Sequence, residues 1–178
     1  MAPPIRWTCL CLLIAVLPAA ADWRSELPGA RRLGVGEFTW FGLRLYTGQL
    51  WTLGPSFDWN QPFALELLYH RSLSRDTLVQ ASLEEMRRLN AGSITPQQSS
   101  AWTTAIEEAF VDVRPGMRIT GVYLPRQGCR FYIDGELRRE VADPIFARLF
   151  FSIWLDPRAR DPQLRERLLG LARNDRET

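Results

Sequence analysis

The chain has 178 residues, of which 46% are hydrophobic and 24% charged, and this balance suits one globular domain with a sizeable core. Its basic residues are all arginines, they alternate along the chain with acidic residues, and the formal net charge is only +2. Because a nucleic-acid footprint needs clustered positive charge, this distribution argues against a nucleic-acid partner.

The first 21 residues have the pattern of an export signal. Arg6 is followed by an apolar run over residues 7–17 and by the small residues Ala19-Ala20-Ala21. The run is much shorter than the about 20 apolar residues of a membrane span. We therefore expect residues 1–21 to be removed, leaving residues 22–178 as a periplasmic domain without an integral membrane segment. An uncleaved membrane anchor is the alternative.

Removal of the signal would leave one of the three cysteines, Cys129. A single cysteine cannot form an internal disulfide, although an exported compartment would permit one. Nothing near Cys129 in the sequence is expected to lower the pKa of its thiol, so the sequence predicts a structural rather than a reactive cysteine.

The first half of the mature chain reads as two strands followed by two helices. The strands are expected at 37–50, with a bend or bulge at Gly42 or Gly48, and at 63–71, with a loop between them. Apolar residues at helical spacing predict a helix over 74–89. A second helix is expected after Thr95-Pro96-Gln97-Gln98, which has the form of a capping box with proline at the first helical position.

The second half reads as three strands followed by two helices. Strands are expected at 117–124, 129–134 and 136–141, and helices at 144–155 and from 162 to about 172. Asp134-Gly135 has the composition of a type I′ hairpin turn. Asp143 can cap the helix that begins at Pro144. Hairpins and segregated helices together predict an α+β domain, an antiparallel sheet covered by helices.

Several kinds of chemistry lack their usual signatures. The chain has one histidine, His70, and no histidine, cysteine and carboxylate cluster with metal-ligand spacing. It also lacks a G-x-S-x-G nucleophile elbow and a G-K-[ST] phosphate loop. Glu84-Glu85 and Glu107-Glu108 are neighbours on helices and do not share a face, which favours solvated surface. The sequence therefore predicts no metal and no cofactor.

Aromatic and basic residues from the two early strands form the strongest candidate site. They are Trp40, Arg44, Tyr46, Trp51, Tyr69 and Arg71. In a regular strand, Trp40, Arg44 and Tyr46 share a face. A pocket of aromatic rings with one or two arginines would suit an amphiphile that carries a carboxylate. The alternative is that these are core aromatic residues beside solvated arginines. The apolar stripe of the helix over 144–155 is predicted to be core.

Five segments of the chain resemble a known family. They are FALELLYHR, ASLEEMRR, VDVRPGMRITGVYLP, FYIDGELRREVADPIFARLFFSIWLDPRARDP and LRERLLG. In this order, over residues 34–170, they resemble the chalcone isomerase-like proteins of bacteria. The resemblance implies an open-faced β-sandwich, in which a large antiparallel sheet is covered by a helical layer.

The superfamily that this resemblance implies includes plant enzymes that cyclise chalcones, fatty-acid-binding relatives and non-catalytic helpers, so the fold alone does not decide function. The plant enzymes use an arginine near the first strand, where this chain has Arg31 or Arg32. Their threonine falls at Phe41-Gly42, and their tyrosine and asparagine fall in residues 77–85, which contain neither.

We therefore expect a non-catalytic protein that binds a small hydrophobic acid such as a fatty acid. The resemblance and the residue pattern place its cleft between sheet and helices, with Arg44, Tyr46, Tyr69 and Arg71 at the head group. One alternative is an isomerase or lyase that acts on an unknown substrate through Arg32 and Tyr46. Another is an envelope interaction protein with no small ligand. The sequence does not define the oligomeric state.

Overall fold

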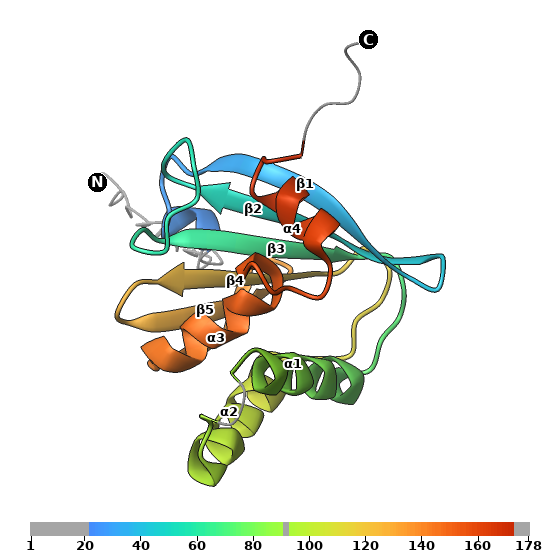
Figure 1. Cartoon of the computed structure of the whole chain (residues 1–178), viewed down its shortest axis with the longest axis vertical. Coiled ribbons are helices and arrows are strands. Elements are labelled where there is room, and N and C mark those ends of the chain that lie inside the picture. Colours follow the sequence, from blue (N-terminus) through green and yellow to red (C-terminus); the bar gives the residue numbers. More distant parts are fainter. Residues whose placement is uncertain (1–21, 91–92, 173–178) are drawn as a thin grey trace, which may run out of the picture.

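A computed structural model describes residues 22–90 and 93–172 of the chain (Figure 1). The expected export signal, residues 1–21, lies outside this range. Six antiparallel strands form one open sheet in which each strand pairs with its neighbour in the sequence. Four α-helices pack on one face of this sheet (Figure 1). The α+β class predicted from the sequence is therefore confirmed.

The elements follow the chain in three groups. Strands β1 (Arg31–Trp40), β2 (Leu43–Thr52) and β3 (Phe63–Tyr69) come first, after the short 3-10 helix η1 (Trp23–Ser25). Helices α1 (Arg75–Asn90) and α2 (Pro96–Ala109) follow. Strands β4 (Arg118–Leu124), β5 (Gly128–Ile133) and β6 (Glu136–Val141) and helices α3 (Pro144–Leu155) and α4 (Pro162–Leu168) complete the domain. None of the helices in the described ranges is long and apolar enough to span a bilayer.

The expected strand over 37–50, long or broken by a bend or bulge at Gly42 or Gly48, is two strands, because the chain reverses at Phe41 and Gly42. Phe41 and Gly42, with φ angles of 47° and 74°, form a two-residue turn between β1 and β2. The residue pair Thr39–Arg44 follows the pair Phe38–Tyr46, so Leu45 is an extra residue in β2. Such a bulge reverses the alternation of side chains between the two faces of a sheet. Phenylalanine in the first turn position hid this hairpin from sequence reasoning, because asparagine, aspartate or glycine usually stands there.

The hairpin predicted at Asp134-Gly135 is confirmed. Both residues have positive φ angles, 48° and 90°, as a type I′ turn requires. The Asp134 carboxylate also accepts a hydrogen bond of 2.7 Å from the backbone N–H of Arg118, which ties the turn to the start of β4.

The predicted helix caps are present in the structure. Thr95 and Gln98 form a reciprocal capping box at the start of α2. The Asp143 carboxylate accepts hydrogen bonds from the backbone N–H groups of Ile145 and Phe146 at the start of α3. These bonds satisfy backbone donors that the first helical turn leaves free, so each helix starts at a defined residue.

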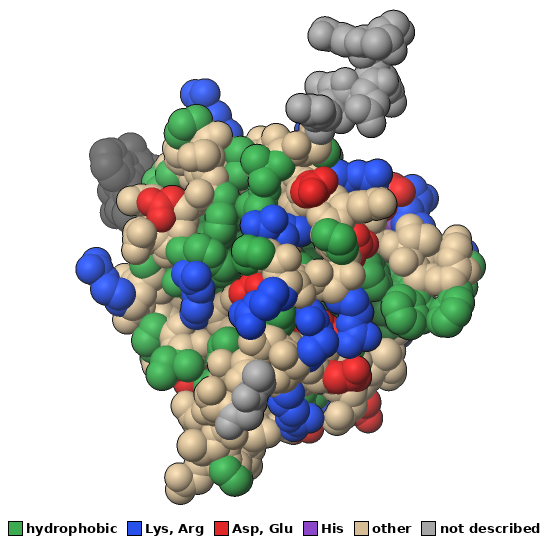
Figure 2. Space-filling view, in the orientation of Figure 1, with side chains coloured by type: hydrophobic (Ala, Val, Ile, Leu, Met, Phe, Trp, Pro, Cys, Tyr) green, Lys and Arg blue, Asp and Glu red, His purple; other side chains and the backbone are tan. Residues whose placement is uncertain are grey.

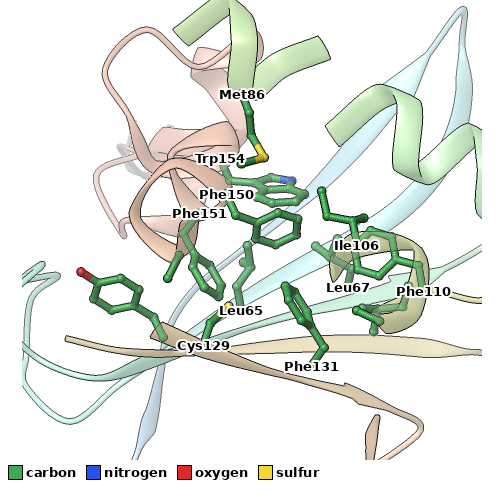
Figure 3. Close-up of a cluster of buried hydrophobic side chains, with 14 of the residues drawn as sticks. Leu65, Leu67, Met86, Ile106, Phe110, Cys129, Phe131, Phe150, Phe151 and Trp154 are labelled. Carbon is green, nitrogen blue, oxygen red and sulfur yellow. The ribbon is translucent and has the colours of Figure 1, made fainter. Parts of the chain in front are cut away.

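The main core lies between the sheet and the helices. Figure 3 shows aromatic rings of α3, including Phe150 and Phe151, pointing toward the sheet residues Leu65 and Phe131. A glycine in β4 makes room for them, because a Cβ atom on Gly121 would lie 2.8 Å from the Phe151 ring. A smaller cluster on the opposite face joins Trp23 and Leu27 to Ala64, Val122 and Tyr132.

Helix α4 sits directly on the backbone of β1. A Cβ atom on Gly34 would lie 2.1 Å from the carbonyl oxygen of Arg167, and one on Gly36 would lie 2.7 Å from Leu164. Residues other than glycine would therefore force α4 away from the sheet. This close approach positions Leu164, which lines the candidate site described next.

Candidate functional site

A cavity of about 220 Å³ lies between the helix-covered face of the sheet and helices α1, α3 and α4. Its floor consists of side chains from β2 to β5, including Leu65, Leu67 and Ile119. Phe131 and Phe110 close one side of it, and both point into the core in Figure 3. Almost all of this lining is apolar, so the cavity offers an environment for hydrocarbon rather than for charged groups.

Helix α3 supplies the opposite wall. Phe150, Phe151, Ile153 and Trp154 line the cavity. The sequence predicted this stripe to be core, and it is buried core, but the same side chains also form the wall of the cavity. Helical periodicity identifies a buried face and cannot tell whether that face meets other side chains or an internal space.

Two tyrosines, the buried Tyr69 and the partly buried Tyr46, place hydroxyl groups beside the apolar lining of the cavity. The rings of Tyr46 and Tyr69 lie edge to face with centroids 5.8 Å apart, and both line the cavity. The Tyr46 hydroxyl accepts a hydrogen bond of 2.9 Å from Trp154 Nε1. This bond uses an acceptor site of the Tyr46 oxygen and leaves its proton free to be donated.

Burial raises the pKa of both tyrosines. For Tyr46, desolvation outweighs the hydrogen bond from Trp154, and the charge of Asp161 raises the pKa further. For Tyr69, desolvation is again the main cause and the neighbouring Tyr46 adds to it. Both phenols are therefore protonated at neutral pH. They can donate hydrogen bonds to an oxyanion, but they are poorly matched to proton transfer, which needs a pKa near the working pH.

Charged residues surround the mouth of the cavity. Arg160, which lies between α3 and α4, lines the mouth and forms ion pairs with Glu85 and, at 3.4 Å, with Glu84 of α1. Arg88 binds Glu85 at 2.9 Å and also donates a hydrogen bond to the backbone carbonyl of Arg158. These contacts join α1 to the connection between α3 and α4 across the opening.

Of the four residues predicted to contact a head group, the structure brings Tyr46 and Tyr69 together in the cavity. Arg44 does not line it. The bulge at Leu45 places Arg44 on the other face of the hairpin, where it forms an ion pair of 2.9 Å with Glu37. The expectation that Arg44 and Tyr46 share a face is therefore wrong, because it assumed a regular strand.

Arg71 and Arg32 also lie away from the cavity lining. Strand β3 ends at Tyr69, so Arg71 lies beyond the strand and does not share a face with Tyr69 through strand alternation. The Arg71 side chain is exposed. Arg32 donates a hydrogen bond of 3.3 Å to Gln49, and Gln49 in turn bonds to Glu66 on the face opposite the helices. The ligand-binding and catalytic roles of these arginines stay predictions.

Sequence reasoning missed Arg160, the arginine that does reach the cavity. It belongs to the Pro157–Pro162 connection, which reads as an ordinary link between two helices. Its position depends on how α1 packs against α3, and no local pattern encodes that packing. The one usable signal was the pair of Asp-Pro steps, which fixes both ends of a short, well-defined connection.

Metal and thiol chemistry find no support in the described ranges. Within residues 22–90 and 93–172, no group of three or more His, Cys, Asp or Glu side chains could hold a metal ion. Cys129 is buried in the core, and burial raises the pKa of its thiol. A protonated, inaccessible thiol is a poor nucleophile.

Comparisons with known proteins agree with this fold. Residues 43–170 match the protein family described as chalcone isomerase-like. A solved structure of a fatty-acid binding protein from Arabidopsis thaliana is similar, with a TM-score of 0.62 and 13% sequence identity. The match covers 80% of this chain and 88% of that one. No curated protein matches the chain in sequence. At this level of identity, the structural likeness shows a shared fold.

Proposed function

The chain belongs to the chalcone isomerase-like family, and we propose that it is an exported, non-catalytic protein that binds a small hydrophobic acid such as a fatty acid. The observation that carries this proposal is the largely apolar cavity between the sheet and helices α1, α3 and α4, which two tyrosines also line. An apolar pocket with a few placed polar groups is the usual form of a site for a small amphiphile.

The size of the cavity suits one small ligand. Its volume of about 220 Å³ exceeds the about 150 Å³ of an apolar cavity that holds benzene. It lies below the about 300–1,000 Å³ typical of pockets for drug-sized ligands. The apolar lining of this space suits a hydrocarbon chain of moderate length.

The polar groups suit a carboxylate. Tyr46 and Tyr69 are protonated donors inside the cavity, and Arg160, which is paired with Glu84 and Glu85, lies at its mouth. Hydrogen bonds to a charged acceptor are stronger than those between neutral groups. The similar Arabidopsis protein is described as fatty-acid binding, which adds support from a relative of the same fold.

The exported location rests on the sequence of residues 1–21. A positive residue, a short apolar run and a small-residue cleavage site are the parts of a secretory signal. We propose that the domain functions in a bacterial periplasm after removal of this segment.

The isomerase alternative lacks a supporting observation. Its two candidate residues, Arg32 and Tyr46, do not meet in the described structure. Tyr46 lines the cavity, whereas Arg32 bonds to Gln49 on the opposite face of the sheet. The raised pKa of Tyr46 also opposes a role as catalytic acid or base.

Native mass spectrometry of the delipidated mature protein tests the proposal. Titration with saturated fatty acids from octanoate to palmitate should give a complex with one acid per chain. Ala81 lies on α1 at the rim of the cavity, so Ala81→Trp should block the opening and abolish this complex. Gln80→Trp is the matched control, because Gln80 is the exposed neighbour on the same helix and does not line the cavity.

Two outcomes would contradict the proposal. The first is the absence of any complex across the whole series of acids. The second is a complex that Ala81→Trp leaves unchanged, because such a ligand would be bound outside this cavity.

A further inference from the structure

The end of the β1–β2 hairpin exposes a cluster of large apolar side chains. Phe41 is 89% exposed, Leu43 50% and Trp40 46%. The hairpin projects beyond the other strands in Figure 1, and Figure 2 shows hydrophobic side chains gathered at this projecting end, on the right of the view. We call Trp40, Phe41 and Leu43 the hairpin tip. A contiguous exposed apolar group of this kind is typical of a surface that binds a protein partner or a membrane.

Backbone strain at Phe41 separates the hairpin tip from ordinary exposed residues. Phe41 has a φ angle of 47°, a left-handed conformation that is unfavourable for a bulky residue. The chain uses the same turn geometry at Asp134, with a φ of 48°, and there it places a residue that tolerates this conformation. A strained phenylalanine that is 89% exposed contributes little to folding, so strain at this position points to a function.

The hairpin tip is connected to the cavity through a row of aromatic rings. Phe41 packs edge to face against Trp40 at 5.1 Å, and Trp40 stacks on Phe38 at 6.4 Å. Phe38 in turn stacks on Tyr46 at 5.0 Å. Phe38 and Tyr46 line the cavity, so apolar surface continues along one face of the hairpin from solvent to the candidate ligand site.

The opposite face of the same hairpin is polar. Arg44 and Glu37 form an ion pair of 2.9 Å there, with both side chains about half exposed. The hairpin end is therefore amphipathic and carries no uncompensated charge from this pair. Its affinity for a surface would come from the apolar side chains rather than from electrostatic attraction.

We propose that the hairpin tip inserts into the interface of a lipid bilayer and that the bound acid passes between membrane and cavity along this face of the hairpin. The second part rests on the proposed function, whereas the insertion itself does not. Tryptophan and phenylalanine are favoured at the boundary between head groups and acyl chains.

A protein partner fits the hairpin tip less well. Large aromatic side chains present about 150–250 Å² each, so two rings and a partly exposed leucine offer roughly 400 Å². Stable protein interfaces bury about 800 Å² on each partner. A projecting tip also lacks the flat or concave shape of most such interfaces, but it can enter a fluid acyl layer without a complementary surface.

Vesicle flotation of the ligand-free mature protein tests the insertion. With vesicles of phosphatidylethanolamine and phosphatidylglycerol, the wild type should float, and it should still do so in about 1 M salt, where charge interactions are screened beyond about 3 Å. Phe41→Asn removes the ring and places a residue suited to the turn. It should lower the partition coefficient by about tenfold or more without loss of thermal stability. Leu137→Asn, which removes an exposed apolar side chain from β6, is the matched control and should leave flotation unchanged.

The remaining outcomes decide against the proposal. Wild-type protein that stays with the buffer fraction, or a Phe41→Asn variant that floats as well as wild type, overturns it. A third contrary result would come from sedimentation. If the wild type is a dimer and Phe41→Asn is a monomer, the hairpin tip binds a second copy of the chain instead of a bilayer. Fatty-acid affinity, measured separately by native mass spectrometry, should be the same in wild type and Phe41→Asn. If the wild type binds no fatty acid, the proposed function is contradicted, but the flotation result still tests insertion of the hairpin tip.

Discussion

Trp154 Nε1 donates a hydrogen bond of 2.9 Å to the hydroxyl of Tyr46, and this bond links α3 to β2 at the cavity wall. It satisfies the indole N–H in an environment where an unpaired donor is costly. The same oxygen keeps its proton for a ligand, so one residue serves both the fold and the site.

Tyr46→Phe should therefore destabilise the protein by about 1–2 kcal/mol, because it leaves the Trp154 N–H without its acceptor. Urea denaturation of Tyr46→Phe, Trp154→Phe and the double variant measures the interaction free energy between the two side chains. The double variant should recover part of the loss, since both partners are then apolar.

Tyr69→Phe should change stability by less than about 0.5 kcal/mol, because no hydrogen bond to its hydroxyl is found within the described ranges. Equal losses for Tyr46→Phe and Tyr69→Phe would mean that the bond is not the cause.

Stability should fall in alkaline solution. Burial raises the pKa values of Tyr46, Tyr69 and Cys129, so the folded protein keeps three protons that the unfolded chain releases. The contribution is complete below about pH 8 and is lost as the pH rises, first through Cys129 above about pH 8.5 and then through both tyrosines above about pH 10. Each group lowers the free energy of unfolding by about 1.4 kcal/mol per pH unit in its range.

Urea midpoints measured from about pH 7 to pH 11 check this loss. Tyr69→Phe removes one of the titrating groups. Above about pH 10, the free energy of unfolding should therefore fall less steeply with pH than in the wild type. A stability that does not change between about pH 8 and pH 11 would show that these groups titrate alike in the folded and unfolded chain.

Gly34→Ala should strongly destabilise the domain. The added Cβ would lie 2.1 Å from the Arg167 carbonyl oxygen, which belongs to helix backbone and cannot move without displacing α4. We expect a loss of about 3 kcal/mol or more, together with weaker ligand binding, because Leu164 of α4 lines the cavity. Gly54→Ala is the control. Its nearest contact is an ordinary 3.7 Å, so thermal denaturation should show little change.

Arg160→Ala should affect ligand exchange more than stability. Arg160 pairs with Glu84 and Glu85 at a half-exposed position, and such pairs contribute about 0–1 kcal/mol. Its loss removes two of the contacts that join α1 to the connection between α3 and α4 and leaves the hydrogen bond of Arg88, so stopped-flow measurements should show faster release of a bound fatty acid. Arg139→Ala removes a comparable ion pair with Glu108 away from the cavity and should leave release unchanged. Identical release rates in the two variants would argue against a role for Arg160 at the mouth.

Local chemistry in the sequence predicts much of this structure. Asp134-Gly135, the Thr95 capping box and the Asp143 cap each determine their neighbours' backbone through short-range hydrogen bonds, and each is confirmed. The resemblance to chalcone isomerase-like proteins named the family that the comparison shows.

The errors arise where the fold depends on context. The turn at Phe41 has no favourable local residue, and the bulge at Leu45 reversed the face on which Arg44 was expected. Arg160 reaches the cavity only because α1 and α3 pack together, which is a long-range event. Tyr46 and Tyr69 were found because both lie in regular pairing between β2 and β3, beyond the bulge.

Helices α1 and α2 lie within the connection between β3 and β4, although these strands are direct neighbours that a short turn could join. Paired hydrogen bonds between Leu73 and Val113 close the base of this connection. The floor of the cavity and the wall that α1 forms are thus encoded by separate parts of the chain. A protein of this architecture can change the length or composition of α1, and with it the ligand it admits, while every strand keeps its register.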